Sequence, residues 1–363
     1  MKSVFQINTV YQLMISINMC IHHIPDGEVD IIVTDHTPIL KEYMDTLRKC
    51  GLFKQVFYIE SLAFNNRFWK TDNDSKPDFF YDSKKELSQT LMEAQIDYSE
   101  YQTLYVANLD AYSKFIYREY PHLIINLIED GASVCTNDWK TVTLKWNYIK
   151  DFNKVYDMVE KLYLYTPDLM CINLGYSMVK LPEIDADCAK TLELYNYIFK
   201  YDHSFSYPQF VFLEEPFAAD NLKNNDLELM NIISQEVGYE NFFVKTHPRN
   251  IENRSKALGI AQQKDTPWPF ELILMNNIKS DSIYITVNSG ALISTRALFH
   301  QDVKTMFLYK IIKGPTHKVA CEEFINYMDK FCQKYSSKNL LVPRSQNELR
   351  TMLRILKGNK YDE

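Results

Sequence analysis

Residues 125–134 read INLIEDGASV, a run of large apolar side chains that ends on Glu129 and Asp130 and then turns at Gly131. The apolar run predicts a strand buried on both faces, because it is continuous and does not alternate with polar residues. Carboxylates are costly to bury unless something pairs with them or uses them. A strand that simply emerges at the surface also fits this stretch alone, because Asp and Gly are common in turns.

Similar apolar runs recur along the whole chain. They are SVFQI (3–7), VDIIVT (29–34), QVFYIE (55–60), TLYVAN (103–108), LIINLI (123–128), FVFLEE (210–215), NFFVKT (241–246), SIYITV (282–287) and KTMFLY (304–309). Helix-like stretches lie between them, among them 37–51, 150–164 and 185–200. Strands that alternate with helices predict an open, doubly wound α/β sheet, and the restart after YDHSFSYPQF (201–210) predicts a second one. We therefore expect an α/β protein with two Rossmann-like domains, 1–204 and 205–363, facing each other across a cleft.

Composition narrows the class of protein. The 363 residues are 46% hydrophobic and 24% charged, which is typical of a soluble globular protein, and 363 residues favour two domains. The net charge of −7 argues against a nucleic-acid binder, which would be basic. The 7 cysteines are scattered and form no CxxC pair, which fits a reducing compartment and neither a disulfide framework nor a zinc site.

The two ends of the chain bear on localisation. Asn8, Gln12 and Asn18 interrupt the apolar N-terminal stretch, and no run of about 18 apolar residues occurs, so we expect a cytoplasmic protein. The stretch SQNELRTMLRILKGNK (345–360) predicts a basic amphipathic helix. We expect this helix to pack back on the N-terminal domain; peripheral contact with the inner face of a bacterial membrane is the alternative, and a homodimer stays open.

Polar clusters follow several of the predicted strands. They are EDG (129–131), KTHPR (245–249), TPWPFEL (266–272) and VNSGALIST (287–295). Ligands of open α/β sheets bind at the carboxyl ends of the strands, so four such clusters predict a ligand-binding cleft. The polar stretch NNRFWKTDNDSKPDFF (65–80) predicts a long loop. DND (72–74) and DAD (185–187) resemble metal-binding DxD motifs but lie away from strand ends, so we expect no metal site.

Each cluster has a chemical use and an ordinary structural alternative. Ser289 and Gly290 open a helix whose free N–H groups suit a phosphate, although Ser289 also fits as a plain N-cap. His247 suits a phosphate oxygen, and Lys245 and Arg249 beside it favour an anion site over a structural histidine. Glu271 suits a ribose diol or, as a first-turn residue, simply the helix dipole.

The ordered set of these motifs resembles the bacterial sialyltransferases. An acid-acid-Gly, then H-P-R, then P-x-x-x-E, then S-G-A is similar to the lipooligosaccharide sialyltransferase family, glycosyltransferase family 52, with kinship to the bacterial polysialyltransferases. The resemblance runs from INTVYQL (7–13) to VNSGALIST (287–295). It implies a GT-B-like layout and an inverting, metal-independent transfer of sialic acid from CMP-sialic acid to a terminal sugar hydroxyl, expected to be galactose, of a lipooligosaccharide or capsule. No cofactor is implied.

The resemblance also assigns roles to residues. Glu129 matches the base, with Asp130 as its neighbour, and His247 matches the histidine that contacts the departing phosphate. Glu271 matches the ribose ligand, and Ser289 the phosphate-binding serine. The other positions expected to bind the CMP-sugar are Thr9, Gly131, Lys245, Pro248, Arg249, Asn288 and Gly290. Because neighbouring side chains of a strand point to opposite faces, one of Glu129 and Asp130 should face the cleft, and the family match favours Glu129.

The sequence departs from the family pattern at two places. Pro269 is an additional proline, and a single serine precedes Gly290. Two other classes of function stay open: another GT-B enzyme, either a nucleoside-diphosphate-sugar transferase or a nucleotide-sugar 2-epimerase, and a catalytically silent glycan-binding protein. An epimerase needs several acidic residues around the anomeric centre and no acceptor, whereas a silent protein would lack the carboxylate or the histidine.

Overall fold

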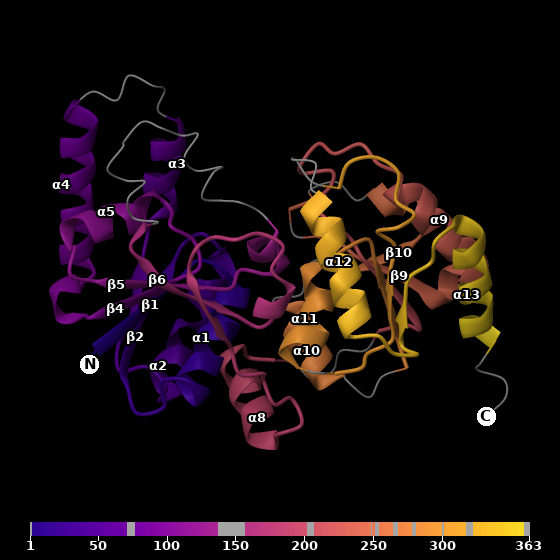
Figure 1. The fold of residues 1–363 in the computed structure, drawn as a ribbon, viewed down its shortest axis with the longest axis horizontal. Helices are drawn as coiled ribbons and strands as arrows, with labels where there is room; N and C mark the ends of the chain where they lie inside the picture. The colour runs from indigo at the N-terminus through magenta and orange to yellow at the C-terminus, as the bar shows by residue number, and fades with distance from the viewer. Residues whose placement is uncertain are drawn as a thin grey trace. The chain divides into compact units, whose positions relative to one another are not determined.

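The computed structural model divides the chain into two compact units, unit 1 (Met1–Tyr201) and unit 2 (Asp202–Glu363) (Figure 1). It describes residues 2–70, 77–136, 157–201, 207–247, 249–250, 254–263, 268–277, 281–299, 301–316 and 322–358.

Unit 1 is built on a seven-stranded parallel sheet in the order β3-β2-β1-β4-β5-β6-β7. Its strands are β1 (Lys2–Ile7), β2 (Glu28–Thr34), β3 (Val56–Ile59), β4 (Thr103–Val106), β5 (Ile124–Ile128), β6 (Val159–Leu164) and β7 (Ser177–Lys180). The chain first adds strands on one side of β1 and then returns to add β4 on the other side. The carboxyl ends of β1 and β4 are therefore the topological switch point, where such sheets bind ligands.

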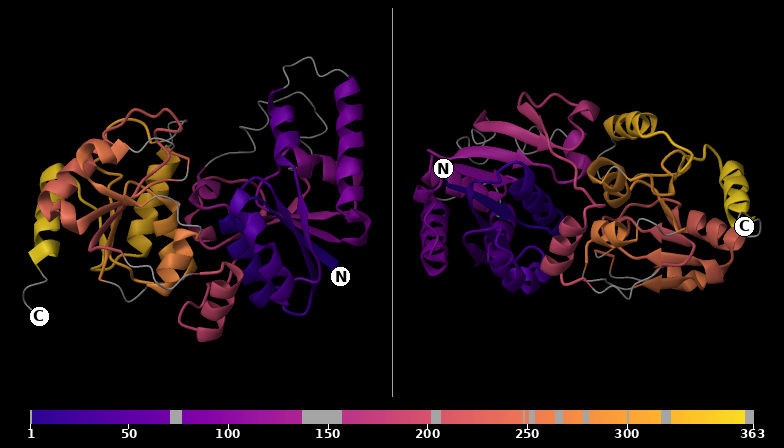
Figure 2. Two further views of the ribbon diagram at one scale, coloured as in Figure 1. Left: turned by 180° about the vertical axis from the view of Figure 1, so that it is seen from behind. Right: turned by 90° about the horizontal axis from the view of Figure 1, so that it is seen from below.

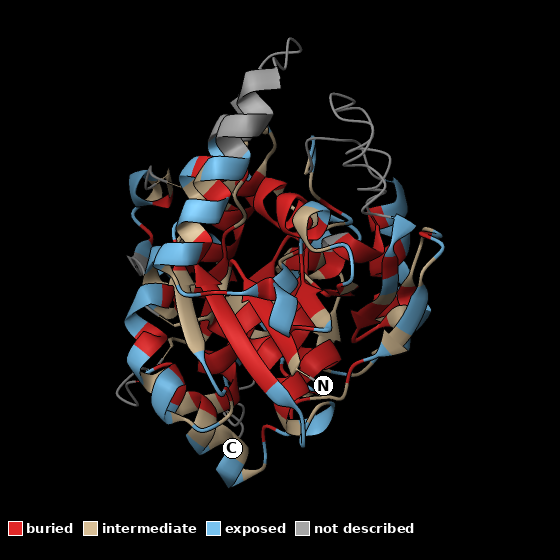
Figure 3. Cartoon of the chain, turned by 90° about the vertical axis from the view of Figure 1, so that its left-hand side faces the viewer, coloured by how far each residue is buried: buried red, intermediate tan, exposed pale blue. Residues whose placement is uncertain are grey.

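Helices cover both faces of this sheet (Figure 2). They are α1 (Val10–His22), α2 (Met44–Lys49), α3 (Leu62–Lys70), α4 (Pro77–Glu93), α5 (Ala111–Glu119) and α8 (Ala189–Ile198), with short 3₁₀ turns η1 (Pro38–Tyr43), η2 (Tyr98–Glu100), η3 (Ala132–Cys135) and η4 (Pro167–Leu169). The central strands β1, β2, β4 and β5 are buried on both sides, as Figure 3 shows in red, which explains their continuous apolar sequence. Helix α8 joins this unit through Tyr195, whose hydroxyl donates to the carbonyl oxygen of Met14 at 2.9 Å.

Unit 2 repeats the same topology. Its parallel sheet has the order β10-β9-β8-β11-β12-β13, so the switch point lies between β8 and β11. The strands are β8 (Phe210–Leu213), β9 (Phe242–Lys245), β10 (Ala261–Gln263), β11 (Ile283–Thr286), β12 (Thr305–Phe307) and β13 (Leu340–Leu341). The helices are α9 (Asp226–Val237), α10 (Phe270–Asn276), α11 (Gly290–Leu298), α12 (Glu322–Lys334) and α13 (Gln346–Gly358), with the turns η5 (Tyr239–Asn241) and η6 (Arg254–Leu258).

The basic C-terminal helix α13 packs against α9 of its own unit (Figure 1). Leu349 and Leu353 are fully buried in the apolar core of unit 2. On the polar side, Glu236 accepts from Arg354 Nε at 2.8 Å and also pairs with Arg350. Two of the basic side chains that suggested a membrane surface are thus bound to a carboxylate of α9. In the described part of the chain, no helix is both long and apolar enough to span a bilayer.

The predicted strands are all confirmed, whereas two other predictions are wrong. Residues 159–164, expected in a helix, form β6, because Val159, Leu162 and Leu164 are buried beside β5 in a parallel ladder. Most of 65–80, expected as a loop, is helical, since α3 runs to Lys70 and α4 begins at Pro77, a residue suited to a first helical turn. The DND motif (72–74) lies outside the described residues.

Candidate functional site

Glu129 lies directly after β5 and is only 5% exposed. Its Oε1 accepts from the hydroxyl of Tyr11 at 3.0 Å, and its Oε2 accepts from the backbone N–H of Tyr165 at 2.8 Å. Burial raises the pKa of this carboxyl to about 7, although both hydrogen bonds oppose the shift. Near neutral pH, Glu129 can therefore both accept and release a proton.

Asp130 is half-buried and has a different environment. Its Oδ1 accepts from the side-chain amide of Gln12 at 3.0 Å, and its Oδ2 accepts from that of Asn108 at 2.9 Å. These amides come from α1 and from the segment after β4, the two sides of the switch point. Asp130 thus lies at the ligand-binding edge of the sheet, held by two neutral donors.

The orientation of the Gln12 amide is fixed from its other end. Gln12 is 1% exposed, and its Oε1 accepts from the backbone N–H of Asn8 at 2.7 Å. The nitrogen must therefore point to Asp130, which makes Asp130 the acceptor of that bond. Asn8 in turn donates from Nδ2 to Asp110 at 3.2 Å. A chain of hydrogen bonds with defined direction links two carboxylates along the carboxyl edge of unit 1.

Two further predicted residues of unit 1 have structural positions at the same edge. Thr9 is the N-cap of α1, and its Oγ1 accepts from the backbone N–H of Gln12 at 3.2 Å. Gly131 has φ +77°, a backbone conformation that residues with a side chain rarely adopt, so glycine is favoured where the chain turns away from β5.

In unit 2, His247 follows β9 and is half-buried. Burial, together with the nearby charges of Arg249 and Lys245, lowers its pKa to about 4, so the ring is neutral at pH 7. The backbone N–H of Arg249 donates to Nδ1 at 3.1 Å. Because Nδ1 accepts this bond, the ring proton is on Nε2, which makes that atom a hydrogen-bond donor.

The cations beside His247 differ in their partners. The exposed guanidinium of Arg249 forms a bidentate pair with Asp220, at 3.0 Å and 3.2 Å. Arg249 is therefore paired with a carboxylate of its own unit. The ammonium of Lys245 lies over the ring of Phe270, 5.8 Å from its centroid. Pro248 lies outside the described residues.

Glu271 lies in the first turn of α10 and is 8% exposed. Burial raises the pKa of this carboxyl, while the charge of Lys245 and a bond from its own backbone N–H lower it. The helix-dipole alternative explains a first-turn glutamate, but it does not explain a buried one, since the dipole interaction needs no burial. Lys245, His247 and Glu271 thus belong to neighbouring segments at one edge of the sheet.

Ser289 is the N-cap of α11, but its side chain makes no capping hydrogen bond. Ser289 therefore occupies the N-cap position without the side-chain hydrogen bond that a capping serine usually makes. Gly290 begins the helix and has open space where a side chain would stand. The first N–H groups of an α-helix have no acceptor within the helix, so the hydroxyl of Ser289 and these amides can bind an anion together. Asn288, before them, is 8% exposed.

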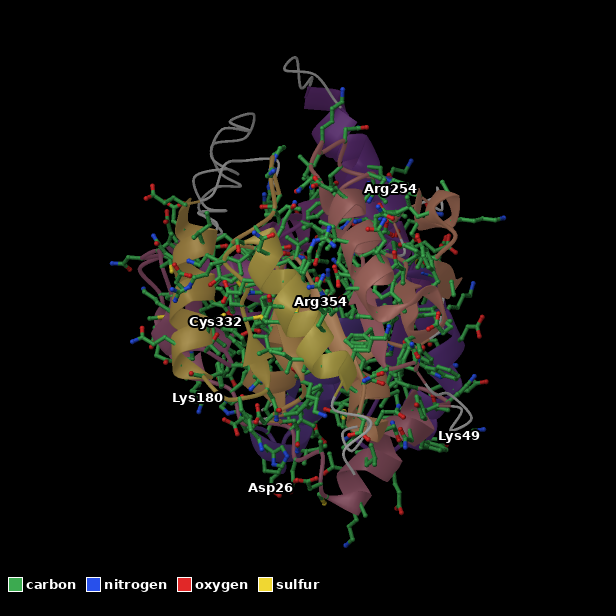
Figure 4. All side chains as sticks on the ribbon, turned by 90° about the vertical axis from the view of Figure 1, so that its right-hand side faces the viewer. Asp26, Lys49, Lys180, Arg254, Cys332 and Arg354 are labelled. Atoms are coloured by element: carbon green, nitrogen blue, oxygen red, sulfur yellow. The ribbon has the colours of Figure 1, made fainter. Side chains whose placement is uncertain are left out.

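Sequence reasoning missed a second pair of carboxylates, Glu214 and Glu215, directly after β8. Glu214 is 4% exposed and accepts from Arg254 at 3.1 Å, and Arg254 also pairs with Asp226 at 2.6 Å (Arg254 is labelled in Figure 4). Burial raises the pKa of Glu215 to about 7. The signal is the same as for Glu129, a carboxylate pair after an apolar strand, but the sequence pattern places all of FVFLEE (210–215) within the strand.

The residues that the structure describes contain no group of three or more His, Cys, Asp or Glu side chains arranged to hold an ion. In the DAD motif, Asp185 Oδ1 instead accepts from the backbone N–H groups of Asp187 and Cys188, at 3.2 Å and 3.1 Å, and forms a turn.

Comparison with known proteins identifies the fold. No protein-family model matches the chain, and no curated protein matches its sequence. Solved structures do match it over nearly its full length. A protein described as a UDP-N-acetylglucosamine 2-epimerase from Listeria monocytogenes has a TM-score of 0.54 at 11% identity, covering 99% of this chain and 88% of that one.

Two further structures are complexes with UDP. LpCGTa has a TM-score of 0.54 at 9% identity, and UGT89C1 of Arabidopsis thaliana a TM-score of 0.51 at 9% identity. Each alignment covers 98% of this chain and 90% of the other. At such low identity the likeness establishes the fold alone: the chain has the two Rossmann-like domains of a GT-B protein.

Proposed function

We propose that the protein is an inverting glycosyltransferase that moves sialic acid from CMP-sialic acid to a terminal sugar hydroxyl of a bacterial surface glycan. The observation that carries this proposal is Glu129, a carboxyl group at the end of a central strand with a pKa of about 7. A general base works best when its pKa lies near the working pH. The motif resemblance supplies the identity of the donor.

In this reaction a sugar hydroxyl attacks the anomeric carbon of sialic acid. The new C–O bond forms as the bond from that carbon to the phosphate oxygen breaks, which inverts the configuration. The hydroxyl proton passes to Glu129, and CMP leaves with the bonding electrons. A sugar hydroxyl is a poor nucleophile at neutral pH, so the base is needed for the attack.

The groups of unit 2 suit a single leaving phosphate. The neutral His247 offers an N–H donor at Nε2, and Ser289 with the first turn of α11 offers a hydroxyl and backbone N–H groups. Such donors stabilise charge that develops on a phosphate oxygen. Because a monophosphate carries less charge than a diphosphate, we propose that these groups suffice without a metal cofactor. Activity that survives EDTA unchanged would agree with this; loss of activity restored by Mg²⁺ would contradict it.

The alternative is a GT-B enzyme that uses a nucleoside diphosphate sugar. The solved structures of similar fold include a complex with UDP and a protein described as a UDP-N-acetylglucosamine 2-epimerase, which is why this alternative is kept. A 2-epimerase would turn over its nucleotide sugar without any acceptor, whereas a transferase would need one. A silent glycan-binding protein would bind the glycan and turn over no donor.

Nucleotide binding separates these candidates. Titration calorimetry of the whole protein with CMP, UMP and UDP, with and without Mg²⁺, should show the tightest binding for CMP and no gain from the metal. Tighter binding of UDP, especially with Mg²⁺, would overturn the sialyltransferase proposal. A hydrolysis assay over a panel of nucleotide sugars then identifies the donor, because transferases slowly hydrolyse their own donor.

A further inference from the structure

Glu215 lies where the central strand of unit 2 meets the turn before α11. In the β8–β11 ladder, Leu213 pairs with Thr286, the last residue of β11. Two residues beyond Leu213, Glu215 contacts the segment that leaves β11. The carboxyl group therefore lies beneath the turn 287–290, whose serine and glycine are the candidate phosphate ligands.

The contacts of Glu215 hold that turn in place. Its Oε1 accepts from the hydroxyl of Thr286 at 3.0 Å, and the carboxyl also accepts from the backbone N–H of Asn288. Thr286 Oγ1 in turn accepts from the backbone N–H of Ser289 at 3.2 Å. Two successive N–H groups of the turn thus point inward to Glu215 and Thr286. The next N–H groups, at the start of α11, are the ones left for an external anion.

The charged groups around Glu215 come from several elements. Glu214 precedes it, Arg249 lies in the turn after β9 and is paired with Asp220, and Arg254 of η6 is paired with Glu214. Lys245 and His247 follow β9, and the turn 286–290 itself carries no ionisable side chain. Burial and Glu214 raise the pKa of Glu215, whereas the hydrogen bonds from Thr286 and Asn288 and the charge of Arg249 lower it.

Ionised Glu215 would place a negative charge directly behind a phosphate at this turn. Like charges that share a site disfavour each other, so an anion bound at Ser289 and Gly290 should favour the protonated carboxyl. By linkage, the protonated carboxyl then favours the anion by the same factor. We propose that Glu215 positions the β11–α11 turn for the phosphate of the nucleotide and takes up a proton when that phosphate binds. This inference rests on the proposed function, which places the donor phosphate at Ser289 and Gly290.

Calorimetry in two buffers tests the proton uptake. CMP is titrated into the full-length protein at pH 7 in MOPS and in imidazole, whose ionisation enthalpies differ, so the difference in heat gives the number of protons bound. With a pKa of about 7, Glu215 should take up about half a proton per CMP. The phosphate of CMP itself titrates near pH 6, so the measure is the difference between the wild type and Glu215→Gln.

Glu215→Gln keeps the size of the side chain and one acceptor oxygen, and it should lose this uptake. Relative to the variant, the wild type should lose CMP affinity by up to about tenfold per pH unit above pH 7. Glu240→Gln is the matched control, because Glu240 is an exposed glutamate before β9, at the opposite end of the sheet; it should behave as wild type. Thr286→Val, which removes the linking hydroxyl, should weaken CMP binding, and Thr286→Ser should restore it.

The outcomes separate this inference from the function on which it rests. If wild type binds CMP and Glu215→Gln shows the same proton uptake and pH dependence, Glu215 is only structural and the inference is wrong. If wild type binds no CMP at any pH, the proposed function fails, and the inference with it. Should Glu215→Gln not fold, carbon-13 NMR of the glutamate carboxyls in the wild type decides: CMP must raise the titration midpoint of Glu215.

Discussion

The two units share one topology, and in each a pair of carboxylates follows a central strand. In unit 1 the pair is Glu129 and Asp130, and in unit 2 it is Glu214 and Glu215. Burial raises the pKa of one member of each pair to about 7. The two pairs therefore look alike in sequence and in the raised pKa of one member, but their second carboxylates have different partners.

The difference lies in what faces the second carboxylate of each pair. Asp130 accepts from two neutral amides, whereas Glu214 pairs with the guanidinium of Arg254. In unit 1 the second carboxylate accepts hydrogen bonds from the neutral amides of Gln12 and Asn108. In unit 2 the second carboxylate shares the guanidinium of Arg254 with Asp226, and the neutral N–H donor of His247 lies on the neighbouring strand end. In the proposed function, a carboxylate at this edge of unit 1 is the base, and the corresponding edge of unit 2 binds the phosphate.

The largest expected effect tests Glu129 as the general base. Glu129→Gln removes the proton acceptor and should slow transfer to the acceptor glycan by about 10²- to 10⁴-fold, while CMP affinity stays within a few-fold of wild type. Transfer rates and CMP titrations measure the two quantities separately. Glu160→Gln is the control, because Glu160 is an exposed glutamate on β6 of the same sheet.

The neighbouring carboxylate sharpens this test. In Asp130→Asn, an NH₂ group replaces one of the oxygens that accept from Gln12 and Asn108, so one of these bonds is lost and the edge is distorted. If Asp130→Asn is inactive while Glu129→Gln transfers sialic acid normally, Asp130 is the base. Full activity of both variants would mean that the motif is only a turn.

The next effect tests the anion side. His247→Ala should lower kcat by about 10²- to 10³-fold, the usual effect of removing one transition-state donor. His247→Gln, which retains an N–H donor, should recover part of the loss. Thermal melting provides the check: a half-buried edge residue contributes little packing, so a drop in Tm as large as that of a core change such as Ile285→Ala would indicate a structural role instead.

Stability against pH reports the burial of Glu129 directly. Its pKa is 4.5 before burial and about 7 in the folded protein, so the unfolded chain loses its proton first. The contribution of Glu129 to the free energy of unfolding is therefore largest below pH 4.5, and it falls by about 3 kcal/mol as pH rises to 7. Glu129→Gln should remove this loss in urea unfolding at pH 5 and pH 8. An unchanged pH dependence in the variant would show that Glu129 is solvated.

The sequence predicts the central strands of both sheets but not all of the strands toward the edges. The central strands are continuous apolar runs, and every predicted one is present. The sequence of β6, which carries Glu160 and Lys161, predicts a helix, and β10 and β13 are only 3 and 2 residues long. A strand whose stability comes mainly from its neighbour leaves a weak pattern in its own residues.

The residues of the candidate site also differ in how well the sequence predicts them. Glu129, His247, Glu271 and Ser289 could be found because each follows a strand or begins a helix, which is a local signal. Gln12 and Asn108 could not, because their role is to hold Asp130, and Gln12 lies 118 positions from it. Only the sheet order, which places β1 beside β4 and β4 beside β5, brings these three side chains together.

The smallest expected effect concerns Tyr11, which supplies one of the two hydrogen bonds to Glu129. Its hydroxyl donates to Oε1 at 3.0 Å and lowers the pKa of the carboxyl against the effect of burial. A hydrogen bond to a charged group is worth about 1.5 kcal/mol, so Tyr11→Phe should raise the pKa of Glu129 by about one unit. The fraction of ionised base at pH 7 then falls several-fold.

The pH profile of kcat distinguishes this effect from a structural one. The activity of the wild type should rise as pH increases through about 7. The curve of Tyr11→Phe should have the same shape but lie about one unit higher in pH, so that the variant reaches full activity near pH 9. Tyr239→Phe, an exposed tyrosine of unit 2, should leave the curve in place. A Tyr11→Phe protein that stays slow at every pH would mean that Tyr11 does more than tune the base. An undisplaced curve would mean that the bond to Glu129 is absent when the enzyme turns over.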